Sequence, residues 1–448
     1  MSTLETERGE KRQLRRVLGF WALVAFGVGD ILGAGIYVLI GEIAGIAGHA
    51  SWIAFGVALV VAGLTALSYA ELGSRFPKSG GEAHFCQQGL GSPGLALMTG
   101  WLVLCSGIVS MATVSRAFAG YALDLFEISA PVALIAMAVA FLMGTAVINV
   151  WGIRQTSRLN IILTIVEVTG LIIVLVAGVL FLAGPGEATS IEVPGTAGAV
   201  QGVGWSAIFQ AGALAFFAFI GFEDMVNVAE EAKDPKRNMP RAILVAVAIA
   251  GLVYMLVIAV ATRVVPPQEL SASQAPLLEV VTRAAPRIPA WLFAAIALFA
   301  VGNTGLLNFV TASRLLYGMA GQRLVPGWFG TLHAKYETPH RATAAVLVVA
   351  IVLAASGTVS FLAGTTSVLI LAVFFLVNVS LLSAKTFRRD HVPEHDGFKV
   401  HALVPVIAAI TCLVLAAFVP GDSMLRALIL VGIGLVLMVI RARKEPQL

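Results

Sequence analysis

The chain has 448 residues, of which 58% are hydrophobic and only 12% are charged, and its formal net charge is +4. Soluble domains carry roughly 25% charged residues, so this composition excludes a soluble globular protein and predicts a surface that faces lipid. The three cysteines, Cys86, Cys105 and Cys412, are too widely spaced to indicate a disulfide framework or a metal site. The excess of positive charge is small, and its distribution along the chain does not suggest nucleic-acid binding.

Apolar runs of the length needed to cross a bilayer, about 20 residues, occur about twelve times along the chain. They lie near 17–45, 50–72, 94–122, 130–150, 158–183, 204–228, 241–264, 290–312, 342–357, 360–383, 401–419 and 423–441. The sequence therefore predicts an all-α polytopic membrane protein. Its expected parts are an N-terminal tail (1–16), a single transmembrane domain (17–441) and a C-terminal tail (442–448). The segments 184–203 and 265–289 are expected to be loops, the second with a short surface helix around Pro276 to Ala285.

Basic residues alternate between connections, which predicts the orientation of the chain. Of the 29 Lys and Arg residues, 24 fall in the two tails and in every second connection. Lys and Arg gather in the cytoplasmic loops of membrane proteins. We therefore expect an even number of spans, a multi-pass protein of the cell (cytoplasmic) membrane, and two cytoplasmic termini.

Two spans are interrupted by glycine beside acidic residues. The first contains "GVGDILGAGIYVLIG" (27–41), and the sixth contains "FFAFIGFEDMVNVAEE" (216–231). Glycine weakens a helix by roughly 1 kcal/mol relative to alanine, and irregular backbone at membrane depth persists only where it is buried or lines a cavity. Interrupted spans at corresponding positions of two halves indicate a transporter site. The offset of five spans predicts inverted repeats at about 17–183 and 204–383, with two extra helices at about 401–441.

The interruptions suggest how a zwitterion is bound. Unwinding between Gly33 and Gly35 would free N–H groups at the positive end of the following half-helix, which suits a carboxylate. Carbonyl groups freed before this break, and around Phe219 and Ile220 in the sixth span, suit an ammonium group. The alternative is that these glycines are close-packing contacts between helices, as small residues often are in membranes.

Five segments carry a resemblance to a known family. They are "GVGDILGAGIYVLIG", "SYAELGSRFPKSGGEAHF" (68–85), "INVWGIRQTSRLN" (148–160), "FFAFIGFEDMVNVAEEAKDPKRNMPRAI" (216–243) and "ASRLLYGMAGQRLVP" (312–326). In order and spacing they resemble the landmarks of the amino acid–polyamine–organocation (APC) permeases. The resemblance implies a 5+5 inverted-repeat fold with discontinuous helices 1 and 6. It also implies amino acid transport by alternating access, either coupled to protons or by exchange.

The resemblance also implies the substrate-binding residues. Ala34 and Gly35 would present amides to the substrate carboxylate, whereas Ile31 would offer a carbonyl to the amino group. The other members of the implied site are Gly33 and, in the sixth span, Phe217, Ala218, Phe219 and Ile220, with Phe217 as an aromatic lid or gate. The alternative for each apolar member is plain packing.

Two acidic residues depart from the family pattern. Family members that resemble "NIILTIVEV" (160–168) carry a lysine where this chain has Glu167, and they usually have a small or apolar residue where it has Asp30. Intramembrane carboxylates are functional candidates, and two acids near one another suggest a shared proton. We therefore hypothesise that Glu167, alone or with Asp30, couples transport to protons. The alternatives are two capped structural acids or a cation bound between them.

Other polar residues bear on substrate choice. Ser106 stands at the span-three position where some cationic amino acid carriers have an acid, which favours a neutral amino acid. Because Asp30, Glu167 or Glu223 could still supply a negative charge, a cationic amino acid or a polyamine remains open. Glu223 takes the place of an acid common in the family and is expected to anchor the inner half-helix. Three polar residues of the eighth span are expected to join helices rather than bind substrate: Asn303, Thr304 and Asn308.

Other protein classes lack support in the sequence. There is no HExxH, GxSxG or Walker pattern, and no channel filter of the TVGYG type. The sequence therefore predicts a non-enzymatic carrier without cofactor or metal site, whose partners are an amino acid, protons and the bilayer, and no nucleic acid. A polyamine or organic cation carrier of the same fold, a divalent-metal carrier, an ion channel and a transport-dead sensor are the alternatives.

Overall fold

The computed structural model describes residues 16, 18–77, 81–128, 130–151, 153–184, 203–321, 325–336, 338–391 and 395–444. For residues 153–161, 230 and 440–444 it describes the backbone alone. The predictions for the N-terminal tail up to residue 15, for positions 185–202 of the outer loop and for the last four residues lie outside this range.

Throughout the described residues the regular elements are helices, and the one β-type contact is a parallel bridge between Leu18 and Ala232. In chain order they are α1 (Phe20–Ile31), α2 (Ala34–Ala47), η2 (Gly48–Ala50), α3 (Ser51–Arg75), α4 (Gly81–Leu90), α5 (Pro93–Asp124), α6 (Pro131–Trp151), α7 (Ile153–Ala183), α8 (Trp205–Ala215), η3 (Phe216–Phe219), η4 (Phe222–Glu231), α9 (Pro235–Val264), α10 (Pro267–Ala272), α11 (Pro276–Ala284), α12 (Ala290–Gly321), η5 (Gly327–Gly330), α13 (His340–Ser356), α14 (Val359–Lys385), η6 (Arg389–His391), α15 (Leu403–Ala417) and α16 (Gly421–Lys444).

The helices fall on the predicted apolar runs. In the described part of the chain, nine helical segments are long and apolar enough to cross a membrane, and α1, α13 and α15 are shorter apolar helices. This confirms the prediction of an all-α polytopic membrane protein. The surface helix expected in the second outer loop is present as α11, whereas the sequence did not predict α4 or α10.

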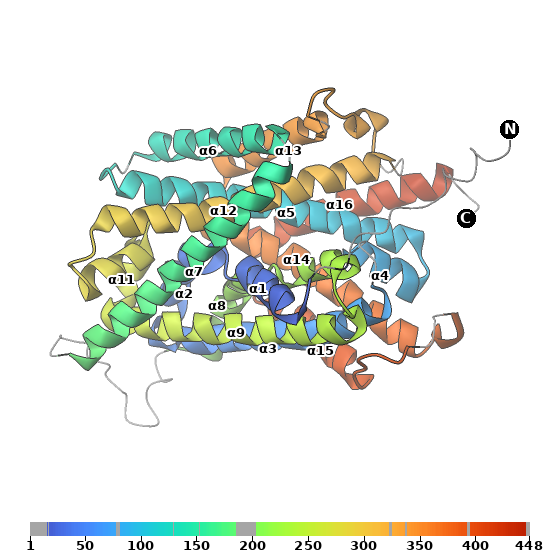
Figure 1. The fold of residues 1–448 in the computed structure, drawn as a ribbon, viewed down its shortest axis with the longest axis horizontal. Coiled ribbons are helices and arrows are strands. Elements are labelled where there is room, and N and C mark those ends of the chain that lie inside the picture. The colour runs from blue at the N-terminus through green and yellow to red at the C-terminus, as the bar shows by residue number, and fades with distance from the viewer. Residues whose placement is uncertain are drawn as a thin grey trace.

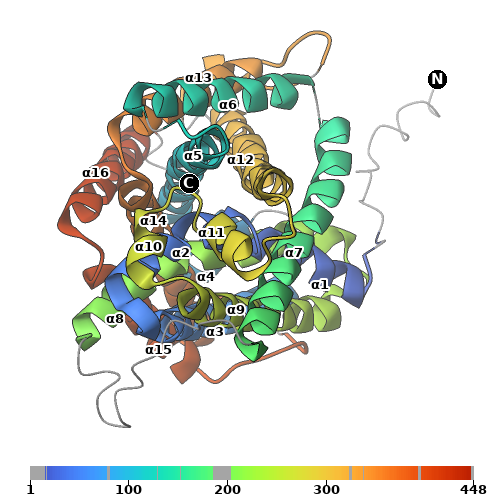
Figure 2. The same cartoon turned by 90° about the vertical axis from the view of Figure 1, so that its left-hand side faces the viewer.

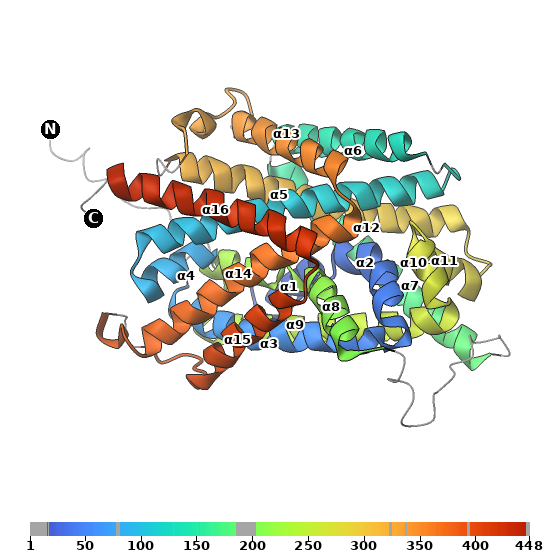
Figure 3. The same ribbon diagram turned by 180° about the vertical axis from the view of Figure 1, so that it is seen from behind.

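The helices form an elongated bundle (Figure 1). Its layers are α3 and α9 on one side, α5 and α12 in the middle, and α6 and α13 on the other, with α7 crossing diagonally over one face (Figure 1). The short helices α10 and α11 lie at one end, which faces the viewer in Figure 2. The helix α4 lies at the other end, and α14, α15 and α16 cover the opposite face of the bundle (Figure 3).

Two pairs of packed helices fit the predicted repeat. The helix α3 packs against α9, and α5 packs against α12. If the two halves of the chain are equivalent, these pairs are the second and third spans of each half. An inverted repeat would bring such partners together around the centre of the bundle, so the 5+5 arrangement remains our prediction.

An aromatic cluster holds the second interrupted helix in place. Tyr69 of α3 packs edge-on against Phe85 of α4, Phe222 of η4 and Phe374 of α14, with ring centroids 5.4 to 6.0 Å apart. Phe216 of η3 packs against the same Phe374. Such aromatic pairs contribute about 0.5–1.5 kcal/mol each beyond the area they bury. The cluster therefore fixes η3 and η4 against three other helices.

The two interrupted helices are also joined through their backbones. The N–H of Leu18, just before α1, donates to the carbonyl of Glu231 at the end of η4 (3.0 Å), and the N–H of Lys233 donates to the carbonyl of Leu18 (2.8 Å). These bonds connect the start of the first interrupted helix to the end of the second.

Candidate functional site

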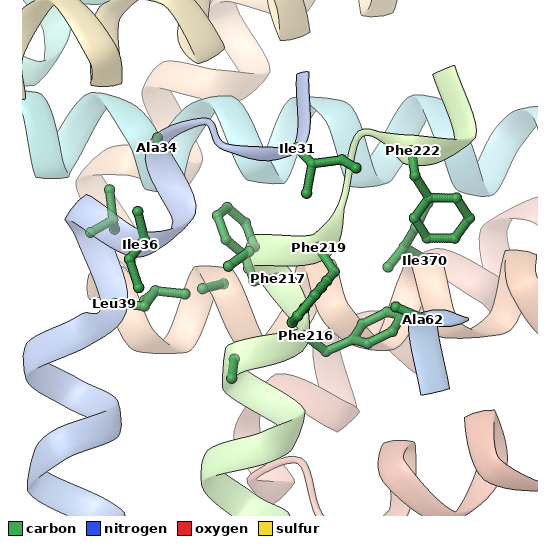
Figure 4. Packing of buried hydrophobic residues seen from close by; sticks show 14 of the residues in the cluster. Ile31, Ala34, Ile36, Leu39, Ala62, Phe216, Phe217, Phe219, Phe222 and Ile370 are labelled. Atoms are coloured by element: carbon green, nitrogen blue, oxygen red, sulfur yellow. The ribbon is translucent and has the colours of Figure 1, made fainter. Parts of the chain in front are cut away.

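The first interruption separates α1 from α2 near the middle of the bundle. α1 ends at Ile31 and α2 begins at Ala34, so Leu32 and Gly33 are the unwound residues, and they link the two helices in a short non-helical segment (Figure 4). The predicted unwinding at Gly33 to Gly35 is thus displaced by one or two residues. Because the first N–H groups of a helix have no intrahelical acceptor, Ala34 and Gly35 present hydrogen-bond donors at the gap.

The second interruption lies directly beside the first (Figure 4). η3 ends at Phe219 and η4 begins at Phe222, with Ile220 and Gly221 between them. Gly221 has a φ of +129°, which side-chain-bearing residues rarely adopt, and a Cβ there would lie 2.8 Å from the carbonyl oxygen of Asp30. Glycine is therefore required where the two breaks touch.

Glu223 caps the second break. Its Oε2 accepts a hydrogen bond from the N–H of Gly221 at 2.8 Å, and its side chain is buried. A carboxylate that accepts from the backbone satisfies a donor freed by the interruption. This contact fits the expected anchoring role of Glu223 in the inner half-helix.

A cavity lies between the two breaks. It is lined by Gly29, Asp30, Ile31, Gly33, Ala34, Gly35, Ser110, Phe217, Ala218, Ile220, Gly221, Asp224, Asn303, Thr304, Leu307, Asn308 and Thr311. The structure thus brings together eight of the predicted residues: Asp30, Ile31, Gly33, Ala34, Gly35, Phe217, Ala218 and Ile220.

Four of the predicted residues lie elsewhere. Phe219 is not in the cavity wall, because its ring packs edge-on against Tyr254, with centroids 5.4 Å apart. Ser106 and Glu223 line a second, adjoining cavity. Glu167 is fully buried on α7 beyond the lining residues.

Thr304 of α12 contacts the predicted carboxylate site. The N–H of Ala34 donates to its Oγ1 at 2.8 Å, so the residue does join two helices, as expected. It also engages one of the two amides that the resemblance assigns to the substrate. The hydroxyl still carries its own proton and can donate it to a carboxylate while accepting from Ala34.

Tyr254 of α9 lies at the predicted ammonium site. Its hydroxyl is within hydrogen-bond distance of the carbonyl oxygen of Ile31 and of that of Ala218, the latter at 2.9 Å. One hydroxyl proton can be donated to only one acceptor fully at a time. This residue was not among those predicted from the sequence. A signal for it was present, since Tyr254 is a lone phenol inside the apolar run "GLVYMLV" (251–257).

Glu167 is a buried acid whose neighbours include Asp30 and Asn303. Its side chain is fully buried, and within the described structure neither carboxylate oxygen has a hydrogen-bond partner. Asp30 is near enough for the two charges to interact, and Asn303 is the polar neighbour on α12. The structure therefore brings the two predicted coupling acids together. A buried polar group without a partner requires an explanation, and inside a membrane protein a functional role is the first to consider.

Asp30 interacts with a second acid as well. Asp224, which follows Glu223 in η4, lines the same cavity and is near enough for its charge to interact with that of Asp30. The sequence analysis gave Asp224 no role. Asp30 beside the first break and Asp224 beside the second are thus close enough for their charges to interact.

A further acid lies outside the membrane-spanning helices. Glu82, on the short helix α4, is buried, and its Oε1 accepts from the hydroxyl of Tyr69 at 3.3 Å. Burial, and next the nearby charge of Asp224, raise the pKa of Glu82 to about 7, against the opposing effect of its hydrogen bonds. Glu82 therefore changes protonation close to neutral pH.

These features define a class of protein. Two discontinuous membrane helices meet at a cavity in mid-bundle, and residues of both breaks line it. This is the arrangement of secondary transporters, which bind substrates at broken helices. The class is thus a membrane transporter.

The chain belongs to the amino acid permease family, whose family model matches residues 18–439. Among its relatives, the branched-chain amino acid permease BcaP of Bacillus subtilis is 27% identical, over 98% of this chain and 96% of the relative. An uncharacterized transporter of Mycobacterium tuberculosis is 30% identical, over 94% and 90% of the two chains. Cationic amino acid transporter 4 of Homo sapiens is 32% identical, over 77% and 55%. The predictions of the permease family and of a non-enzymatic transporter are thereby confirmed.

Proposed function

We propose that this amino acid permease is a secondary active transporter that holds its substrate in the cavity between the two breaks. The substrate carboxylate binds the N–H of Gly35 and the hydroxyl of Thr304, at the start of α2, where the helix dipole favours negative charge. The substrate ammonium binds the carbonyl oxygens of Ile31 and Ala218 beside Tyr254. The observation that carries this proposal is that the residues bearing these groups, Ile31, Gly35, Ala218 and Thr304, line one cavity.

Phe217 covers the site in this proposal. It lines the cavity from η3, its side chain is buried, and in Figure 4 its ring lies between the two interrupted helices. Rotation of one aromatic ring would open or close the path to the backbone groups. The role of lid or gate that the resemblance implies is therefore compatible with its position.

Transport is driven by protons in this account. The two carboxylate oxygens of Glu167 have no hydrogen-bond partner in the described structure, and its charge interacts with that of Asp30, which lines the cavity. A proton on this pair neutralises a charge beside the substrate, and its release changes the field in which the substrate is held. Proton-coupled symport follows if the proton moves with the substrate. Exchange of one amino acid for another follows if the pair stays protonated throughout.

The proposed setting is the cell membrane, with both termini on the cytoplasmic side. This orientation rests on the alternation of basic residues between connections. It places α4 at the cytoplasmic end and α10 and α11 at the outer end, consistent with their positions at opposite ends of the bundle (Figure 1).

Uptake by the full-length protein in proteoliposomes tests the proposal. A panel of labelled amino acids and amines is offered with and without an inwardly directed proton gradient. We expect accumulation of at least one amino acid, increased by the gradient. If the folded protein accumulates no amino acid, or only metal ions, the proposal is rejected.

A further inference from the structure

A second cavity continues from the first toward the inner half-helix η4. The two cavities share the lining residues Ser110, Ile220, Asp224, Asn308 and Thr311. The wall of the second is completed by Val103, Ser106, Gly107, Glu223, Ala312, Leu315, Thr366 and Ile370. Ile31, Gly35 and Ala218, whose backbone groups are proposed to hold the substrate, line the first cavity and not the second, so the second is the space available to a substrate side chain.

The charged side chains that line this space are all acidic. Asp224 lines both cavities, Asp30 lines the first and Glu223 lines the second. Among the lining residues of both cavities there is no lysine, arginine or histidine. Charges in a low-dielectric interior occur with a partner of opposite sign. Within the described residues the protein does not itself provide that partner along the cavity walls.

Asp224 is positioned to meet a ligand. Asn227, one turn later in η4, donates to its Oδ1 at 3.2 Å, which orients the carboxylate. The side chain of Asp224 is only partly buried and lines both cavities. Glu223, by contrast, is already engaged with the N–H of Gly221. Asp224 is therefore the acid best placed for direct contact, and Glu223 is a second acid that lines the same cavity.

Neutral polar groups of the two adjoining cavities also favour a donor-rich ligand. Asn303 lines the first cavity, is 1% exposed, and in the described structure its Oδ1 has no hydrogen-bond partner. Both cavities are also lined by Ser110 and Asn308, and the Nδ2 of Asn308 donates a hydrogen bond to the Oγ of Ser110 at 2.9 Å, which leaves the Oδ1 of Asn308 and a lone pair of Ser110 as acceptors. A ligand bearing several N–H donors would satisfy them.

We propose that the second cavity is a side-chain subsite for a cationic group, with Asp224 as its direct partner. The substrate class that fits is an amino acid with a basic side chain, such as lysine, ornithine or arginine. This proposal rests on the proposed function, because it requires the α-amino and carboxylate groups to be held at the two breaks. An acid at the position of Ser106 in span three is then not required, because Asp224 of the sixth span supplies the acidic group in the same cavity.

The test compares pairs of substrates that differ in side-chain charge. Arginine is paired with citrulline, and lysine with norleucine, in uptake and competition assays on the full chain in proteoliposomes. We expect the apparent affinity for the basic member of each pair to be at least about tenfold higher than for the neutral member. A factor of this size is the effect of one charge-assisted contact. Asp224→Asn should remove this preference, whereas Asp224→Glu should keep much of it.

A matched control and a folding check accompany these variants. Asp422→Asn makes the same chemical change at an exposed position in the first turn of α16 and should leave the preference unchanged. The size-exclusion profile and the melting temperature identify any variant that fails to fold. If Asp224→Asn does not fold, Asp224→Glu provides the decisive comparison. Loss of the preference for basic substrates in folded Asp224→Glu would count against the subsite.

The outcomes separate the two proposals. Uptake of neutral amino acids with exclusion of basic ones overturns the subsite and leaves the proposed function intact. A preference for basic amino acids that survives Asp224→Asn also overturns it. If the folded wild-type protein transports no amino acid, the proposed function fails and the subsite fails with it.

Discussion

At the scale of single residues, the site combines carbonyl, amide, hydroxyl and carboxyl groups from segments far apart in the sequence. Tyr254 lies 223 residues from Ile31, and Thr304 lies 270 residues from Ala34. Hydropathy and spacing identify the interrupted spans, yet they do not show which side chain from another span faces each freed group. For this reason the sequence predicted the donors and acceptors of the breaks but missed Tyr254 and Asp224.

Glu167→Gln tests the coupling role at this scale. The amide keeps the shape of the side chain but cannot exchange a proton, so we expect accumulation driven by a proton gradient to fall to the level of protein-free vesicles. Exchange between internal and external substrate should persist, because it needs no net proton movement. The assay is uptake with and without the gradient beside counterflow of preloaded substrate. Full gradient-driven uptake by the variant would disprove the role.

Tyr254→Phe tests the bridge between the two breaks. Removal of the hydroxyl leaves the carbonyl oxygens of Ile31 and Ala218 without this donor, at a cost of about 1–3 kcal/mol. We expect a lower melting temperature in detergent. A saturating amino acid substrate should reduce the difference in melting temperature between variant and wild type, because the substrate ammonium supplies the missing donors. An equal deficit with and without substrate would argue against ammonium binding at these carbonyls.

The Glu82 pKa predicts a pH dependence of stability. Burial raises this pKa to about 7 in the folded protein, above its ordinary value of 4.5. Between these values the folded state holds a proton that the unfolded state releases, so stability falls as pH rises from about 4.5 to about 7. In Glu82→Gln the free energy of unfolding should therefore fall by up to about 3 kcal/mol less over this pH range than in the wild type. Melting temperatures of both proteins across this range are the measurement, and parallel curves would contradict the assignment.

At the scale of elements, the breaks follow from composition and their exact positions from packing. The glycine-rich stretch predicted an unwound first span, but the unwound residues are Leu32 and Gly33, because Gly35 lies in the first turn of α2 against η3. The break at Gly221 follows the prediction closely. The 3-10 geometry of η4 after it was not foreseen, since local sequence does not distinguish a tight helix from an ordinary one.

Gly35→Ala tests the contact between the two interrupted helices. A Cβ at Gly35 would lie 2.4 Å from the Cα of Ala218, a backbone atom that cannot move aside cheaply. Overpacking of this kind costs about 1–3 kcal/mol, and it would separate the groups proposed to hold the substrate. We expect strongly reduced uptake and a lower melting temperature.

The control for this variant is Gly144→Ala in α6. A Cβ at Gly144 would meet no atom within 4 Å, and alanine favours the helix over glycine. Its uptake should match that of wild type. Equal behaviour of the two variants would show that the tight approach of Gly35 to Ala218 has no functional consequence.

At the scale of the whole molecule, hydropathy was sufficient to predict the long apolar helices and their order, but not the short helices α4 and α10. The confirmed features are the all-α membrane fold and the permease family. The layer arrangement of α3 with α9 and α5 with α12 follows from side-chain packing, which periodicity does not specify. In our proposal substrate choice depends on cavities whose acids come from α1 and η4, and these acids are brought together only by the three-dimensional arrangement.

The central claim is that an amino acid is held between the two breaks, and the most direct test is the position of a bound substrate. The measurement is a cryo-EM structure of the full chain with an amino acid that it transports. We expect the substrate carboxylate within hydrogen-bond distance of the Gly35 N–H and the Thr304 hydroxyl, and the ammonium beside the carbonyl oxygens of Ile31 and Ala218. Density for the amino acid outside the cavity that these residues line would contradict the account.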